Sequence, residues 1–182
     1  MKNICFITSS RADYDLIKTS MSLFKESVNF KLQLIVTGSH LIDGLGHTSD
    51  QIVDEGFSID KEILLDEKTD LNNIIKNFSS SIEEFSNCFT SLRSDAVVLL
   101  GDRYEILSAS LAAFLNSIPI IHLHGGELTL DSQDDTFRHC ITKLSSLHFV
   151  AHNDYKTRVV QLGEDPMKVH NVGPLALDNL RS

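Results

Sequence analysis

The stretch AVVLLGDRYE, residues 96–105, decides the fold class. Ala96 to Leu100 form an apolar run without polar alternation, which is typical of a strand buried on both faces. Gly101 breaks the run, and the charged Asp102 and Arg103 come before an apolar segment of helical period. A buried strand that ends in polar residues and leads into a helix is the repeating unit of α/β proteins, which bind ligands at the strand ends.

The same unit repeats along the chain. Short apolar runs predict strands at residues 3–8, 31–37, 59–65, 96–100, 118–122, 147–150 and 169–172. Apolar residues three and four apart predict helices at residues 14–25, 50–55, 71–92, 104–115, 135–144 and 154–162. The three prolines mark no linker, and we find no internal repeat. The sequence therefore predicts one α/β domain, a Rossmann-like parallel sheet flanked by helices.

Composition limits the expected partners and the expected compartment. The 182 residues carry a formal net charge of -9 with a pI near 5.2, so we do not expect a nucleic acid partner. The widely spaced Cys5, Cys88 and Cys140 have neither metal-ligand nor disulfide spacing, which favours a reducing cytoplasm. The sequence starts without a signal-peptide pattern and has no run of about 18 apolar residues. We expect a cytoplasmic protein that does not contact membranes.

The first predicted strand ends in TSSRADY, residues 8–14, where hydroxyl side chains and Arg11 lead into a helix. Such a turn can offer backbone N–H groups and a guanidinium to a phosphate or a uridine. A simple helix cap with a surface arginine explains the same residues equally well.

Gly38, Ser39 and His40 follow the second predicted strand, and the loop DGLGHT comes after them at residues 43–48. Glycines and imidazoles suit a flexible active-site loop that binds phosphate or transfers protons near neutral pH. A single histidine in such a place is more often a surface or structural residue. His40 is nevertheless a candidate binding residue.

The stretch IIHLHGGE, residues 120–127, contains the densest group of candidate residues. Its two adjacent glycines are unfavourable in a strand, so these residues must do something other than extend the sheet. In the helix that follows, the spacing places Asp134 with Arg138 on one face and Asp135 with His139 on the next. Ion pairs explain part of this pattern, but not the gathering of carboxylates and imidazoles at neighbouring strand ends.

Asp102 has two interpretations. It can be the N-cap of a helix that begins at Arg103, and that role alone would account for an aspartate there. The functional interpretation gains weight because the next strand ends in a comparable group of polar residues.

Metal and cofactor chemistry is not expected. His122, His124, Glu127 and Asp134 are possible metal ligands, but the sequence lacks H-E-x-x-H and paired-cysteine spacing. The glycine-rich dinucleotide fingerprint and the P-loop are also missing, which argues against NAD and ATP.

Five motifs occur in order over almost the whole chain: SRADY at 10–14, GSH at 38–40, LGDRYE at 100–105, HLHGGE at 122–127 and RHCITK at 138–143. Together they resemble the hydrolysing UDP-N-acetylglucosamine 2-epimerases of bacterial sialic acid synthesis. RVVQLGE at 158–164 and NVG at 171–173 are similar to the same family. The resemblance extends more distantly to the non-hydrolysing epimerases and to the epimerase half of the bifunctional animal enzyme.

The resemblance implies a GT-B architecture, in which two Rossmann-like domains hold a nucleotide sugar in the cleft between them. Family members are about twice as long as this chain, so residues 1–182 would form the amino-terminal domain. Most UDP contacts and one catalytic histidine of the family would then belong to a carboxyl-terminal domain outside the chain. Family members commonly self-associate, which implies a homo-oligomer for the full-length enzyme.

The implied reaction converts UDP-N-acetylglucosamine and water to N-acetylmannosamine and UDP without a cofactor. A base removes the C2 proton as UDP leaves C1, and water then adds to the 2-acetamidoglucal with inverted C2 configuration. By motif position, Asp102 and Asp134 match family acid or base residues, and Arg11 matches a nucleotide-contacting arginine. Several relatives have a glutamate where this chain has His124, while Glu127 follows the glycines, so either residue can act at the sugar.

Four more residues are candidates for substrate or nucleotide binding, namely His40, Arg103, Arg138 and His139. The preferred UDP-sugar stays open, because close relatives use a diacetylated bacillosamine nucleotide. A GT-B glycosyltransferase fragment and a non-catalytic nucleotide-binding module are further alternatives. The motifs at residues 101–103 and 124–127 argue against the glycosyltransferase.

Overall fold

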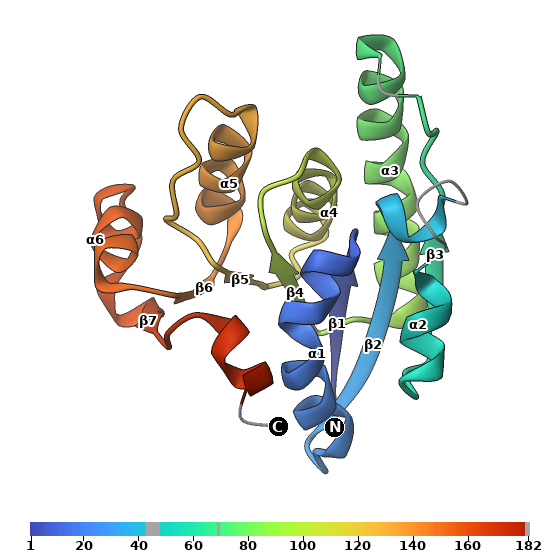
Figure 1. Ribbon diagram of the computed structural model, residues 1–182, viewed down its shortest axis with the longest axis horizontal. Coiled ribbons are helices and arrows are strands. Elements are labelled where there is room, and N and C mark those ends of the chain that lie inside the picture. The colour runs from blue at the N-terminus through green and yellow to red at the C-terminus, as the bar shows by residue number, and fades with distance from the viewer. Residues whose placement is uncertain (43–47, 69, 181–182) are drawn as a thin grey trace.

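The computed structural model describes residues 1–42, 48–68 and 70–180, so most of the glycine- and histidine-containing loop expected at 43–48 lies outside the described residues. In the described part of the chain, one parallel sheet runs in the order β3-β2-β1-β4-β5-β6-β7 (Figure 1). Its strands are β1 (Lys2–Thr8), β2 (Phe30–Thr37), β3 (Lys61–Ile63), β4 (Ala96–Leu100), β5 (Ile120–Leu123), β6 (Leu147–Val150) and β7 (Val169–Asn171). The predicted α/β class is confirmed.

Helices connect successive strands. They are α1 (Arg11–Glu26), α2 (Ser49–Asp54), α3 (Leu71–Leu92), α4 (Tyr104–Leu115), α5 (Gln133–Leu144) and α6 (Asn153–Gln161). Shorter 3-10 segments are η1 (Gly38–Leu41), η3 (Pro166–Lys168) and η4 (Leu175–Leu180). All predicted helices and strands are present, with ends that differ by a few residues.

Helix caps account for two of these differences. The Ser10 hydroxyl accepts a hydrogen bond from the Asp13 N–H, so α1 begins at Arg11 rather than at residue 14. The Ser132 hydroxyl accepts from the Asp134 N–H in the same way, so α5 begins at Gln133 rather than at residue 135. Both caps place charged residues in the first helical turn at the carboxyl edge of the sheet.

The strand order reverses between β1 and β4. The chain runs from β1 outward to β2 and β3, and then returns to pair β4 with the other side of β1, where Ile4 lies opposite Ala96. Loops that leave the two strands on either side of such a reversal diverge, which opens a crevice at the carboxyl edge. The loops after β1, β2, β4 and β5 therefore line the region where a ligand is expected.

Two apolar layers cover the sheet. On one face, α3, α4 and α5 pack on the sheet through a cluster that includes Phe85, Phe89, Ile106 and Ile141. Phe85 and Phe89 belong to the apolar stripe predicted for residues 71–92. On the other face, α1 and α2 pack through a cluster that includes Tyr14, Ile17 and Ile52.

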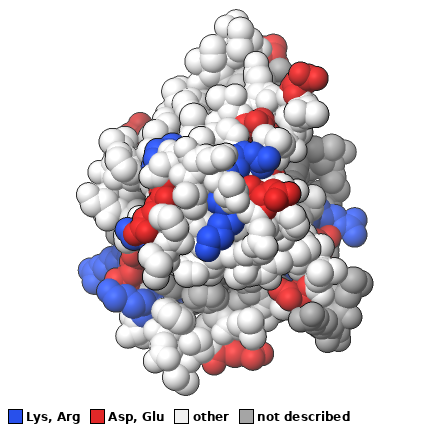
Figure 2. Space-filling model, turned by 90° about the vertical axis from the view of Figure 1, so that its left-hand side faces the viewer, with Lys and Arg blue, Asp and Glu red and all other residues white. Residues whose placement is uncertain are grey.

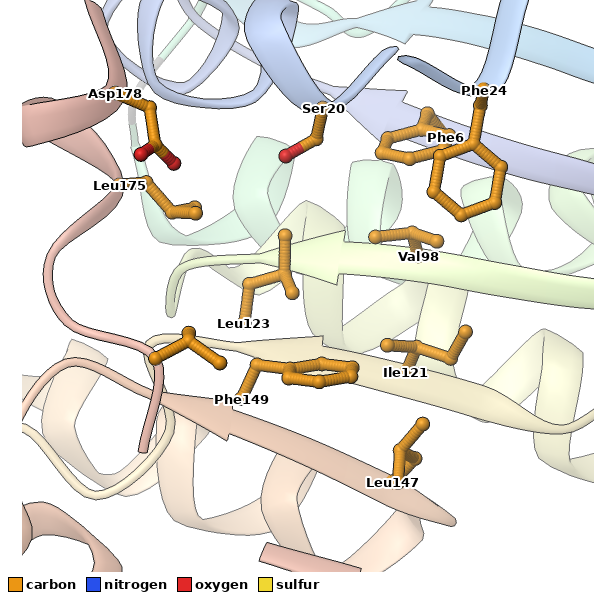
Figure 3. A pocket seen from close by; sticks show the side chains of 11 residues that line it. Phe6, Ser20, Phe24, Val98, Ile121, Leu123, Leu147, Phe149, Leu175 and Asp178 are labelled. Atoms are coloured by element: carbon orange, nitrogen blue, oxygen red, sulfur yellow. The ribbon is translucent and has the colours of Figure 1, made fainter. Parts of the chain in front are cut away.

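The second face has an apolar cavity where no α-helix of the described chain covers β5 and β6. The cavity has a volume of about 420 Å³ and lies between α1, the sheet and η4 (Figure 3). Ile121 and Leu123 of β5 and Leu147 and Phe149 of β6 point into it. It lies on the sheet face rather than at the strand tips, and its few polar groups do not suit a nucleotide sugar.

The surface has mixed charge. On the side that carries α6, lysine and arginine side chains are interspersed with aspartate and glutamate (Figure 2). No described helix is both long and apolar enough to cross a membrane. Cys5, Cys88 and Cys140 are free thiols.

Candidate functional site

Arg138 connects the tips of β4 and β5 to the start of α5. Only 7% of its side chain is exposed, and its Nη2 group donates to the Asp102 carboxylate and to the Thr129 hydroxyl, 3.0 Å away. Its Nη1 group donates to the Glu127 carbonyl oxygen at 2.9 Å and to the Asp135 carboxylate at 3.1 Å. A buried arginine with this many partners is held in one position and fixes the Asp102 carboxylate beside it.

These contacts correct two expectations from the sequence. Asp135, rather than Asp134, pairs with Arg138, and Asp135 also lies 3.5 Å from His139 Nε2. Asp102 is not a helix cap, because α4 begins at Tyr104 with Arg103 as its N-cap residue. The Asp102 carboxylate instead reaches Arg138 across the strand tips.

His124 and Glu127 form a pair just beyond β5. His124 Nδ1 lies 3.2 Å from a Glu127 carboxylate oxygen, and the Leu175 N–H points to His124 Nε2 at 3.5 Å. These partners place the proton of a neutral ring on Nδ1, where it can be donated to Glu127. Burial lowers the pKa of His124 and raises the pKa of Glu127, so the two groups approach each other in proton affinity. A pair of this kind is suited to proton transfer.

The backbone at this pair is unusual. His124 has a positive φ of 62°, which is uncommon for a residue with a side chain and occurs often at functional sites. Gly126 follows with φ 78° and lies against α6, where Arg158 donates to its carbonyl oxygen. The predicted break after β5 is confirmed, and α6 holds the glycine turn that carries Glu127.

We expect Gly126→Ala to lower the free energy of unfolding by about 3 kcal/mol, because a Cβ there needs a left-handed backbone and meets packed neighbours. That Cβ would overlap the Tyr155 carbonyl oxygen and lie 2.9 Å from Val159 Cγ2. Gly173→Ala is the matched control, since Gly173 has φ 80° with nothing within 4 Å of the added Cβ, and it should cost about 1 kcal/mol. Urea unfolding of both variants measures the difference. Equal decreases in the free energy of unfolding would show that Gly126 is not tightly packed against α6.

His122 of β5 forms hydrogen bonds to the residue after β4 and to α5. It is fully buried, with Nε2 3.2 Å from the Gly101 carbonyl oxygen and Nδ1 3.1 Å from the Thr142 hydroxyl. The carbonyl can only accept, so Nε2 carries the proton and Thr142 donates to Nδ1. Burial lowers the pKa of His122 to about 3, so the ring is neutral near pH 7. It therefore holds the residue immediately before Asp102.

Glu105 is the main site residue that the sequence reasoning missed. Its side chain is 1% exposed, and one carboxylate oxygen accepts a hydrogen bond from Arg103 Nε at 2.5 Å. The signal was an acidic residue at the start of an otherwise apolar helix, since Ile106 to Leu115 contain no charge. The pair lies at the reversal point of the sheet and lines a cavity of about 390 Å³ with Gly38 and Ser39.

The other predicted site residues are more dispersed. Arg11 is 68% exposed on the first turn of α1, and its Nε lies 3.7 Å from Asp15. His40 is buried, with Nε2 2.9 Å from the Thr8 hydroxyl and Nδ1 2.7 Å from the Thr48 hydroxyl, so it cannot bind a ligand without losing a bond. Asp134 and His139 are half-buried on α5, near Arg138 in the chain.

The structure thus joins four of the predicted residues in one chain of contacts. Asp102 contacts Arg138, Arg138 contacts the Glu127 backbone, and the Glu127 side chain contacts His124. Carboxylates and an imidazole held at adjacent strand tips can accept and return a proton on a ligand above the sheet edge. Within residues 1–42, 48–68 and 70–180, no three His, Cys, Asp or Glu side chains are grouped to hold a metal ion.

Comparison with known proteins identifies a family and several relatives of this chain. The family model described as UDP-N-acetylglucosamine 2-epimerase matches residues 23–182. The chain is 40% identical to the polysialic acid biosynthesis protein P7 of Escherichia coli, over 100% of this chain and 47% of that protein. It is 42% identical to a protein of Campylobacter jejuni named GDP/UDP-N,N'-diacetylbacillosamine 2-epimerase (hydrolyzing), over 96% of this chain and 46% of the relative. The chain spans about half the length of the curated relatives it matches.

Solved structures share the fold. The crystal structure of UDP-GlcNAc 2-epimerase from Neisseria meningitidis bound to UDP-GlcNAc superposes with a TM-score of 0.87 at 19% sequence identity. The match covers 100% of this chain and 48% of that one. The seven-stranded sheet with its flanking helices therefore corresponds to about half of a larger chain of that fold.

Proposed function

This chain belongs to the UDP-N-acetylglucosamine 2-epimerase family, and on that basis we propose that it forms the amino-terminal half of a hydrolysing 2-epimerase. The enzyme would convert UDP-N-acetylglucosamine and water to N-acetylmannosamine and UDP, as a step in sialic acid precursor synthesis. A second Rossmann-like domain, in the part of the full-length protein that follows this chain, would close over the strand tips and supply most contacts to UDP. Self-association of the full-length enzyme stays a prediction.

The observation that carries the proposal is the contact network of Asp102, Arg138, Glu127 and His124 at the strand tips. In our assignment Asp102 removes the C2 proton of the sugar, while Arg138 holds its carboxylate in position. UDP leaves C1 as that proton is removed, and a 2-acetamidoglucal remains. His124, Glu127 and Asp134 are the groups available to direct water and return a proton to C2 from the other side of the ring.

The proposed nucleotide contacts come from arginines that follow β1 and β4. Arg11, after β1, and Arg103, after β4, flank the crevice where the strand order reverses. Guanidinium groups bind phosphate oxygens in pairs, which suits the diphosphate of a nucleotide sugar. His139 remains a candidate contact beside Arg138, whereas His40 supports the loop after β2.

A second candidate substrate is a UDP-N,N'-diacetylbacillosamine. The Campylobacter relative, which is 42% identical to this chain, bears that sugar in its name. The same elimination and hydration would apply, because the two sugars share the acetamido group at C2 and the UDP at C1.

The test is to incubate the full-length protein with each nucleotide sugar in deuterated water. We expect release of UDP together with a 2-epimerised sugar that carries deuterium at C2, since the new C2–H bond takes its hydrogen from solvent. Mass spectrometry and NMR identify the product and its deuterium at C2. The rates of UDP release from the two nucleotide sugars show which one is preferred. If UDP is released from neither sugar, the proposed function is wrong.

A further inference from the structure

The buried carboxylate of Glu105 lacks a structural explanation. It lies in the first turn of α4, next to residues that pack into the apolar layer under α3 and α5. One carboxylate oxygen accepts from Arg103, but Oε2 is buried and finds no hydrogen-bond partner among the described residues. A buried carboxylate with an unpaired oxygen destabilises a fold, so stability does not explain its position here.

A glycine in the loop after β2 leaves room for the Glu105 carboxylate. Gly38 has a positive φ of 60°, and a Cβ added to it would lie 3.2 Å from the Glu105 Oε1 atom and 2.6 Å from the Ser9 carbonyl oxygen. A side chain at residue 38 would therefore push the carboxylate away from Arg103. The loops after β1, β2 and β4 fit together around this one group.

Glu105 determines how Arg103 is presented. The carboxylate holds the guanidinium at Nε, and in the described part of the chain the two Nη groups donate to no protein acceptor. The Arg103 side chain is 48% exposed and lines the cavity of about 390 Å³, together with Lys68. An arginine fixed at Nε presents its remaining N–H groups as a planar fork, which is the geometry that binds two oxygens of a phosphate.

The charges around Arg103 are consistent with this arrangement. Burial alone lowers the pKa of Arg103, but the neighbouring carboxylates of Glu105 and Asp13 more than offset that effect, so the pKa is raised overall. The Ser9 hydroxyl donates to Asp13 at 2.8 Å, which helps to hold that carboxylate at the tip of β1. The Arg103 guanidinium is therefore a cation that Glu105 holds at Nε, and the same side chain lines the cavity.

We propose that Glu105 is a positioning residue, which orients the Arg103 fork toward the cavity so that it binds a phosphoryl group of the nucleotide diphosphate. The inference rests on the proposed function, because the ligand is the UDP part of the substrate. It adds to that function a residue that touches neither the sugar nor the reacting atoms.

The experiment measures UDP and uridine binding to the full-length protein by calorimetry, for the wild type, Glu105→Gln, Arg103→Lys and the double variant. We expect Glu105→Gln to raise the Kd for UDP about 10-fold, the size of one charge-assisted hydrogen bond, and to leave uridine binding unchanged. The KM for the nucleotide sugar should rise in parallel while kcat stays within about 2-fold. The unfolding temperature should not fall, since the substitution removes a buried charge.

The double variant separates positioning from general damage. If Glu105 acts only through Arg103, adding Glu105→Gln to Arg103→Lys should weaken UDP binding by no more than Arg103→Lys does alone. Glu83→Gln, a change of the same kind on the exposed surface of α3, is the matched control and should bind UDP as the wild type does.

Several outcomes would overturn the inference. UDP binding by Glu105→Gln at wild-type affinity, equal weakening of uridine and UDP, or additive losses in the double variant would each contradict it. If Glu105→Gln does not fold, the Arg103→Lys variant still tests the inference. Wild-type UDP affinity in Arg103→Lys would show that Arg103 does not bind the phosphoryl group, and the inference would then be wrong. If the wild type binds UDP but releases none from a nucleotide sugar, the proposed function fails and the binding comparison still stands.

Discussion

Replacing Asp102 by asparagine in the full-length protein is expected to lower kcat for the nucleotide sugar about 1,000-fold, which corresponds to about 4 kcal/mol in the activation barrier. Asparagine has nearly the same size, and its amide oxygen can still accept a hydrogen bond from Arg138. It cannot accept the C2 proton. The loss should therefore appear in kcat, while KM stays within about 3-fold. Release of UDP under saturating substrate measures both quantities.

The matched control for this experiment is Asp50→Asn. Asp50 is exposed on α2, so the same chemical change there should leave kcat unaltered. A second readout is the exchange of the C2 hydrogen with deuterated solvent, which should fall together with kcat if Asp102 is the base. An Asp102→Asn enzyme that folds normally and keeps more than a tenth of wild-type kcat would rule out the assignment.

The second large effect is a loss of stability in acid that comes from His122. Burial lowers its pKa to about 3 in the folded protein, against 6.5 for an ordinary histidine. Between these values the unfolded chain binds a proton that the folded protein excludes, so acid favours unfolding. The full stability is present above pH 6.5, and His122 alone is expected to remove roughly 5 kcal/mol as the pH falls to 3.

Unfolding in urea at a series of pH values measures this effect. The free energy of unfolding of the wild type should fall steeply from pH 6.5 downward, and the lowered pKa values of the buried His40 and His148 act in the same direction. His122→Gln should lose much of this dependence, because glutamine does not titrate. His170→Gln, on the exposed part of β7, should keep the wild-type slope. Equal slopes for the wild type and His122→Gln would show that His122 is hydrated or charged in the fold.

Local sequence patterns were sufficient to predict the sheet and its helices. A run such as residues 96–100 is apolar on both faces because helices pack on each side of the sheet, so its burial is visible without a structure. The gathering of polar residues at the carboxyl edge then follows from the connections between parallel strands. The strand order itself, with its reversal between β1 and β4, comes from the structure. The network of Asp102, Arg138, Glu127 and His124 was predicted only as a set of neighbours.

Individual partners could not be predicted, because they depend on contacts between distant elements. Helical spacing counts only neighbours on one helix, so it paired Arg138 with Asp134, whereas Arg138 reaches Asp102 on another strand tip and pairs with Asp135 locally. Asp102 resembled a helix cap because it precedes a helix, but α4 begins one residue later than that interpretation requires. The position of Glu105 could not be predicted either, because its carboxylate lies against Gly38, which is far away in the sequence.

The position of β1 in the middle of the sheet also affects how the protein emerges from the ribosome. One edge of β1 pairs with β2 soon after synthesis, but the other edge must wait for β4, since Ile4 lies opposite Ala96. At ordinary rates of translation, roughly ninety residues take about 5 to 20 s to produce. During that interval the apolar strand Cys5–Ile7 has an open edge, which is the period when a nascent-chain chaperone has most to protect.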